Sequence, residues 1–181
     1  MLEGRQVILR LFREEDLDEF LNLHNRCSQR GEFYPISIRP LSANRKDLQE
    51  NGWWGEDQGR MLITDRQGRM LGMIFFFKGA PYQEGYEVGY TLFKREDRGR
   101  GTISEALPLF SAYLFEAKPI HRLYLLTASG NIASRRVAEK SGYRHEGTLR
   151  QAFFLRGKHV DCEMYSLLRN ECPPAAEFAQ G

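Results

Sequence analysis

Two glycines and two arginines stand together where an expected strand gives way to an expected helix. The apolar strand ends at Phe93, a charged loop follows, and Arg98-Gly99-Arg100-Gly101 leads into a helix-like run from Thr102. Backbone amides without side chains at the start of a helix form a binding site for an anion such as a pyrophosphate. The spacing therefore predicts a cofactor that carries phosphate.

Two common nucleotide-binding motifs are excluded by the same residues. A dinucleotide fingerprint needs a third glycine, but Gly99 and Gly101 are followed by Ser104 at that position. A P-loop needs Gly-Lys-Ser or Gly-Lys-Thr after a four-residue gap, and the chain has none here. The loop must bind its phosphates in another structural setting.

The first half of the chain reads as an antiparallel meander that leads into this loop. A helix is expected over 16–25 from apolar residues at spacings of three and four. Residues 28–59 are irregular, with a short helix expected near 44–50. The strands are expected at 7–11, 61–64, 70–78 and 85–93.

Helices and strands alternate in the second half. Helices are expected over 102–116, with Pro108 costing a hydrogen bond or kinking the helix, and over 131–141. Strands are expected at 121–127, 143–149 and 159–168, with a short piece at 153–155 and a hairpin turn at 156–158. No linker or repeat divides the chain, so we expect one domain over 1–171 and a flexible tail over 172–181.

The composition fits a globular protein of 181 residues, with 41% hydrophobic and 28% charged residues. A net charge of only +2 argues against nucleic-acid binding, and no apolar run suits a signal peptide or membrane span. We therefore expect a cytoplasmic location. The three cysteines form no CxxC pair and the four histidines show no ligand spacing, so no metal is expected.

The loop, written Arg98-x-x-Gly101-x-Ile103, resembles the acetyl-CoA pyrophosphate loop of the GNAT acetyltransferase superfamily, [QR]-x-x-G-x-[GA]. Ile103 departs from the small final residue of that pattern. The segment 86–90 resembles the family's fourth strand. Asn131-Ile-Ala-Ser134 and the ending of the chain resemble the ribosomal-protein N-terminal acetyltransferases of the RimJ/RimL type. The resemblance spans about residues 5–169.

The resemblance implies a fold and a reaction. The fold is a mixed α/β domain with a twisted, mostly antiparallel sheet, in which strand 85–93 parts from strand 121–127 in a V-shaped gap. The reaction is acetylation of a primary amine by acetyl-CoA through direct attack in a ternary complex, as a monomer or homodimer. A catalytically quiet acyl-CoA-binding or interaction protein of the same fold is the alternative.

The resemblance also implies which residues bind acetyl-CoA. The pantetheine arm lies beside the backbone of Leu92, Phe93 and Lys94, with the oxyanion near the Leu92 amide. The amides from Arg98 to Ile103 hold the pyrophosphate, helped by the helix dipole at Thr102. The Arg98 and Arg100 side chains either add charge-assisted bonds or only make the surface soluble.

Glu87 is the candidate general base, because it stands in the strand that borders the gap. The alternative is a structural carboxylate bonded to a nearby amide or arginine. Glu84, at the start of the strand, is a weaker candidate near the acceptor. Some members of the resembled branch have a glutamate proposed as base at the position of Phe153, which cannot do acid–base work.

Ser134 is the candidate hydrogen-bond donor to the departing CoA sulfur, since the resembled branch places this serine near it. Its alternative role is to bond the backbone at a helix N-terminus. Asn131 is expected to touch pantetheine, to cap its own helix, or both. Many relatives carry a tyrosine acid where this chain has Ala138.

The acceptor amine is left open by the sequence. It is a protein N-terminus or a small molecule such as a polyamine, an aminosugar, an amino acid or an aminoglycoside. Trp53 and Trp54 fall in the variable segment that forms one wall of the acceptor cleft in this fold. We expect one ring to anchor the segment and the other to face the substrate.

Overall fold

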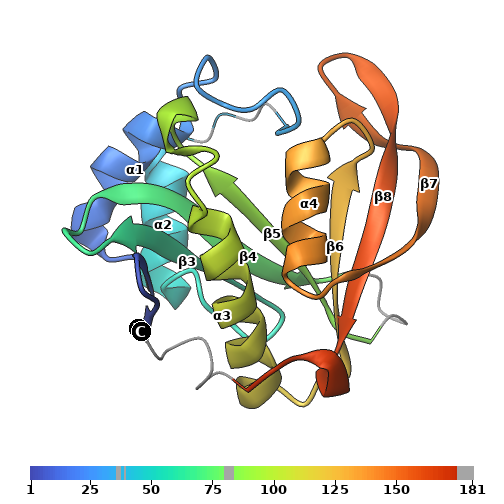
Figure 1. Ribbon diagram of the computed structural model, residues 1–181. Coiled ribbons are helices and arrows are strands. Elements are labelled where there is room, and N and C mark those ends of the chain that lie inside the picture. Colours follow the sequence, from blue (N-terminus) through green and yellow to red (C-terminus); the bar gives the residue numbers. More distant parts are fainter. Residues whose placement is uncertain (36–37, 39, 80–83, 175–181) are drawn as a thin grey trace.

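Strands from both halves of the chain form one sheet in the order β1-β2-β3-β4-β5-β6-β8-β7 (Figure 1). The computed structural model describes residues 1–35, 38, 40–79 and 84–174. The strands are β1 (Leu2–Glu3), β2 (Val7–Arg10), β3 (Gln58–Asp65), β4 (Met70–Lys78), β5 (Tyr86–Leu92), β6 (Arg122–Ala128), β7 (Arg144–Leu155) and β8 (Lys158–Leu168).

The sheet opens at its centre, between β5 and β6. Every other neighbouring pair of strands is antiparallel, whereas β5 and β6 are parallel. Among the described residues, this parallel pair is joined only through Tyr86–Leu123 and Glu87–Tyr124. From Val88 to Leu92, β5 has a ladder partner on its β4 side alone. The predicted mixed α/β fold and its V-shaped gap are confirmed.

Helices cover both faces of the sheet (Figure 1). They are α1 (Leu17–His24), α2 (Leu41–Asn51), α3 (Thr102–Ala117) and α4 (Ile132–Lys140), with short 3-10 turns η1 (Glu14–Asp16), η2 (Arg95–Asp97) and η3 (Arg169–Glu171). Because strand side chains alternate, Ile63 and Ile74 pack with α3 and α4, whereas Leu62 and Met73 pack with α1 and α2. Two apolar cores result, one on each face.

Helix α3 runs from Thr102 to Ala117 without a break, although Pro108 lies inside it. Its apolar stripe, which includes Leu107 and Phe110, is fully buried against the sheet. The helix ends just before Pro119, as the sequence predicts. Among the described residues, no helix is both long and apolar enough to cross a bilayer.

The last hairpin differs from the prediction in one respect. The expected strand 143–149 and the short piece 153–155 are a single strand, β7, which is irregular between Leu149 and Phe153. Gln151 adopts a positive φ of 51° there, a conformation that the residue type does not announce. The predicted hairpin turn is confirmed: Arg156 and Gly157 join β7 to β8 with φ values of 48° and 81°. The expected tail lies outside the described residues from 175 on.

Candidate active site

The glycine loop joins η2 to the start of α3 and depends on a left-handed backbone. Gly99 and Gly101 have φ values of 72° and 83°, which residues with a Cβ rarely adopt. A Cβ built on either glycine would meet no atom within 4 Å. These glycines are therefore required by the backbone rather than by crowding, and open space is left above the loop.

The amides of this loop are available to a ligand. Within the described part of the chain, the backbone N–H groups of residues 99–103 donate no hydrogen bond, and no side chain caps α3. The Arg98 amide differs from the expectation, because it donates to the Arg95 carbonyl at 3.2 Å as the turn of η2 closes. The row of free donors thus begins at Gly99 and points its partial positive charge outward at the helix start.

The two loop arginines fasten the loop to neighbouring backbone. Arg98 Nη2 donates to the Gln29 carbonyl at 2.9 Å, and Arg100 Nε donates to the Glu96 carbonyl at 2.9 Å. Burial and the nearby Arg95 guanidinium lower the pKa of Arg98, which shows that positive charge gathers here. Since each guanidinium carries five N–H donors, both keep donors for an anion.

A buried carboxylate anchors the loop from below. Asp97 in η2 is 3% exposed and accepts a hydrogen bond from Arg69 Nη1 at 2.9 Å. Arg69 also bonds Asp65 Oδ2 at 3.1 Å, at the turn that joins β3 to β4. This chain of charges fixes the loop on the sheet. No local pattern in the sequence indicates it, because the partners are 28 residues apart.

The backbone of β5 turns polar groups into the gap. Phe93 N–H donates to the Leu71 carbonyl at 2.9 Å, on the β4 side. Since backbone groups alternate between the two sides of a strand, those of Tyr90 and Leu92 face the gap. The predicted role of Leu92 is thereby feasible. The Phe93 N–H donates to β4 and its ring is buried against Phe20, so this N–H is not free to bond the pantetheine arm.

Glu87 lies where the two central strands separate. It pairs with Phe77 on β4 and with Tyr124 on β6, and it faces the α1 and α2 side because Tyr86 and Val88 pack in the opposite core. Burial raises the pKa of Glu87 from 4.5 to about 7. Among the described residues this carboxylate has no hydrogen bond and no ion pair, which disfavours the structural alternative.

Asn131 and Ser134 meet at the first turn of α4. The Asn131 side chain accepts a hydrogen bond from Ser134 N–H at 3.2 Å, so the predicted capping role is confirmed. Ser134 Oγ lies 2.8 Å from the phenol oxygen of Tyr90 on β5. Burial raises the pKa of Tyr90 to about 12. Sequence reasoning missed Tyr90, which lies on the opposite face of β5 from Glu87, and no local pattern signals its contact with Ser134.

Ala138 has a packing role, whereas Lys94 and Phe153 lie at the start of η2 and in the last hairpin. Ala138 is fully buried in the core of α3 and α4, so no acid replaces the absent tyrosine at that position. Lys94 precedes η2 as its cap residue and places its Nζ 3.9 Å from Glu96. Phe153 pairs with Val160 in the last hairpin.

The two tryptophans pack differently from the expectation. Trp53 is 5% exposed, and its ring meets Phe12 and Phe20 in the core under α1 and α2. Trp54 packs against Phe76 and Tyr113 on the other core. Trp53 therefore anchors the segment, and the expected substrate contact of the second ring is corrected, because Trp54 turns toward α3. Residues 36–37 and 39 of this wall lie outside the described residues.

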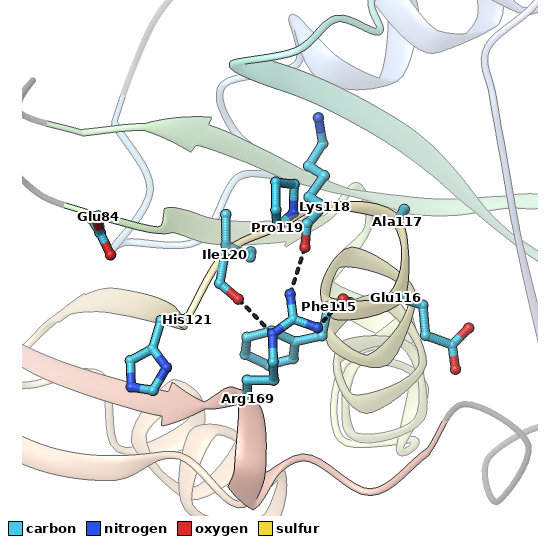
Figure 2. A pocket seen from close by; sticks show the side chains of 9 residues that line it. All are labelled: Glu84, Phe115, Glu116, Ala117, Lys118, Pro119, Ile120, His121 and Arg169. Atoms are coloured by element: carbon cyan, nitrogen blue, oxygen red, sulfur yellow. Dashed lines mark hydrogen bonds between the residues drawn. The ribbon is translucent and has the colours of Figure 1, made fainter.

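Glu84 lies away from the glycine loop. It precedes β5, whereas the loop follows it, so the two are at opposite ends of the strand. Figure 2 shows Glu84 beside an open cavity of about 620 Å³ lined by Phe115, Glu116, Ala117, Lys118, Pro119, Ile120, His121 and Arg169. Arg169 donates to the Ile120 and Lys118 carbonyls at 2.8 and 2.6 Å and closes the end of α3. The structure thus places Glu84 beside this cavity, and its acceptor role stays a prediction.

A narrow cavity adjoins the gap on the α1 side, and the sequence did not reveal its lining. Arg30 is 5% exposed there; its Nε donates to the His24 carbonyl at 2.8 Å and its Nη1 to the Pro35 carbonyl at 2.9 Å. These bonds tie the segment before α2 to the end of α1. The lining residues are Leu23, His24, Arg30, Tyr34, Thr91, Leu92 and Phe93.

Known proteins match most of this chain. The acetyltransferase (GNAT) domain family matches residues 6–144. The putative ribosomal N-acetyltransferase YdaF of Bacillus subtilis (strain 168) is 35% identical over 175 residues, which cover 93% of this chain and 94% of that protein.

Two solved structures show the same fold. RimL, a ribosomal L7/L12 alpha-N-protein acetyltransferase in complex with coenzyme A, has a TM-score of 0.74 and 23% identity over 91% of this chain and 95% of that one. A spermidine N-acetyltransferase from Vibrio cholerae, in complex with CoA and spermine, has a TM-score of 0.77 and 20% identity over 92% and 97%. The chain therefore belongs to the GNAT family of acetyltransferases and resembles its RimL-type members.

Proposed function

We propose that this protein transfers an acetyl group from acetyl-CoA to a primary amine by direct attack in a ternary complex. The observation that carries the proposal is the unpaired Glu87 carboxylate at the point where β5 leaves β6. A buried carboxylate without a partner costs stability, and such groups cluster at functional sites.

The free amides of residues 99–103 fit the pyrophosphate of acetyl-CoA. They point outward at the start of α3, above glycines that leave open space, and Arg98 and Arg100 add positive charge. The gap-facing backbone of Leu92 suits the pantetheine arm and the oxyanion. When bound, acetyl-CoA supplies an acyl group that is activated as a thioester.

Glu87 accepts the proton of the attacking amine, directly or through a water. With a pKa of about 7, the carboxylate is partly ionised at neutral pH and remains basic enough to take a proton. The amine nitrogen forms the amide bond, the carbon–sulfur bond breaks, and Ser134 donates a hydrogen bond to the departing sulfur.

The buried cysteine of β8 does not suit an acyl-enzyme. Cys162 is fully buried on β8, and burial raises the pKa of its thiol to about 11. A buried neutral thiol is a poor nucleophile. Direct attack by the amine therefore agrees better with the chain than transfer through cysteine.

The acceptor is a protein N-terminus or a small amine. The RimL neighbour acts on a ribosomal protein N-terminus and the Vibrio neighbour is a spermidine acetyltransferase, so both acceptor classes occur on this fold. The described residues near Glu87 favour neither a protein N-terminus nor a small amine as the acceptor.

A thiol-release assay with acetyl-CoA and a panel of amines tests the proposal. The panel holds peptides with free N-termini, polyamines, amino acids and aminoglycosides. We expect thiol release that depends on at least one amine. Calorimetry with acetyl-CoA separates the alternative: tight binding without thiol release for any amine would identify a catalytically quiet acyl-CoA-binding protein.

A further inference from the structure

We propose that Tyr90 is a positioning residue for the sulfur end of the site: its phenol donates a hydrogen bond to Ser134 Oγ and thereby directs the serine proton toward the CoA sulfur. The proposal rests on the proposed function, because it takes Ser134 as the donor to that sulfur.

The hydrogen bond spans the opening in the sheet. Tyr90 belongs to β5, where the strand has no ladder partner on the β6 side. Ser134 belongs to α4, which follows β6. Their side-chain oxygens are 2.8 Å apart, and both residues are half-buried. The bond thus ties the two sides of the gap at the level where the strands diverge.

Either hydroxyl could donate across this contact, and we take Tyr90 as the donor because of its two distances. The phenol oxygen lies 2.8 Å from Ser134 Oγ but 3.4 Å from the Ser134 carbonyl oxygen. A hydroxyl donor prefers about 2.7–2.8 Å. If the serine donated to the phenol, the phenol proton would be left with the long contact alone. Donation from Tyr90 to Ser134 gives the half-buried phenol a good acceptor.

A second tyrosine–serine pair in the same protein shows what a purely structural pair looks like. Tyr143 and Ser111 also place their oxygens 2.8 Å apart, in the core. Ser111 Oγ donates to the Leu107 carbonyl at 2.8 Å, so its proton is already used. Ser134 Oγ has no other partner among the residues that the structure describes, and its proton is therefore available.

The phenol remains protonated while it does this. Burial raises the pKa of Tyr90 to about 12, so it is a hydrogen-bond donor throughout the neutral range and not the acid itself. A hydroxyl that accepts a hydrogen bond becomes a stronger donor to its next partner. Tyr90 therefore acts on the sulfur through Ser134.

Calorimetry with CoA and with desulfo-CoA, which lacks the thiol, tests this without any acceptor. A site that stabilises the thiolate binds CoA increasingly better than desulfo-CoA as the pH rises from neutral to alkaline. We expect this preference in the wild type and its loss, by about fivefold, in Tyr90→Phe and in Ser134→Ala. The double variant should lose no more than either single one.

Tyr143→Phe is the matched control, since it removes the phenol of the structural pair, and it should keep the wild-type preference. Unchanged affinity for desulfo-CoA shows that each variant still folds. A wild-type preference in Tyr90→Phe, together with its loss in Ser134→Ala, would overturn the role of Tyr90 alone. Failure of the wild type to bind either ligand would overturn the proposed function and this inference with it.

Discussion

Glu87 combines two properties that make a carboxylate reactive: it is half-buried, and it has no hydrogen bond or ion pair among the described residues. Burial alone raises its pKa to about 7. Most buried carboxylates are paired, as Asp16 is with Arg10 at 2.6 Å, where two hydrogen bonds outweigh burial and lower the Asp16 pKa. This contrast inside one chain supports the proposal that Glu87 is the base.

The pH dependence of the rate tests Glu87 at this scale. The ionised carboxylate is the base, so kcat/KM should fall as the pH drops below about 7. Glu87→Gln should lower kcat by about 100-fold or more and abolish that acidic limb. Initial rates across pH for both proteins measure it. A limb near pH 7 that survives in Glu87→Gln would assign the ionisation to another group.

The substitution Glu87→Gln, which should lower the activity, should raise the stability of the fold. Between pH 4.5 and about 7 the folded protein binds more protons at Glu87 than the unfolded chain, so stability declines as the pH rises through this window. Above it, Glu87→Gln should be more stable than the wild type by about 1–3 kcal/mol. Urea unfolding at pH 8 checks the sign. A less stable variant would show that the ionised carboxylate has a stabilising partner.

At the scale of elements, the glycine loop and α3 form the unit that we propose binds an anion. The loop supplies free amides and the helix supplies its dipole, and both depend on the left-handed turn at Gly101. The left-handed turn was predictable, because paired glycines just before a helix favour it. Anion binding by the loop stays a prediction. The sequence could not predict that the Arg98 amide is used within η2.

Gly101→Glu should reduce CoA affinity by about 100-fold or more, because it strains the turn and places a carboxylate among donors meant for phosphate. Gly52→Glu is the matched control. Gly52 ends α2 with a φ of 63° and also has open space for a Cβ. Calorimetry should show near-normal CoA binding for this control. Equal losses in the two variants would refute the loop assignment.

The charge chain below the loop can be tested in the same way. Arg69→Ala leaves the buried Asp97 carboxylate without its cation and should cost about 1–3 kcal/mol of stability, with weaker CoA binding. Arg66, in the same turn, is bonded to Glu3 and to backbone near the N-terminus. Arg66→Ala should keep CoA affinity. Thermal melts measure the stability of both variants, and calorimetry measures their CoA affinity. Normal CoA binding by Arg69→Ala would show that this ion pair is not needed to hold the loop.

At the scale of the whole molecule, the site exists because two halves of the chain part at the centre of one sheet. Strand positions and the family pattern predicted this architecture, since apolar periodicity is a local property of the sequence. The contacts that tune the site were not predictable in the same way. Tyr90 with Ser134 and Arg69 with Asp97 join distant segments, and the burial of Glu87 follows from how three strands converge.

The acceptor wall shows the same limit. Local signals placed a helix near 44–50, and α2 extends over 41–51. They did not reveal that Trp53 packs under α1 or that Trp54 turns to α3, because ring orientation depends on which core each side chain enters. Trp53 has a positive φ of 53° at the point where successive side chains enter different cores. The orientation of each ring is therefore known only once the sheet and its helices are packed together.

Initial-rate kinetics with acetyl-CoA and the best amine acceptor tests the central claim most directly. The rates are measured over a matrix of both concentrations. Direct transfer across the gap between β5 and β6 predicts double-reciprocal lines that intersect, since both substrates must be bound before thiol is released. Parallel lines would indicate an acyl-enzyme and would contradict direct transfer. Thiol release that no amine accelerates would contradict it as well.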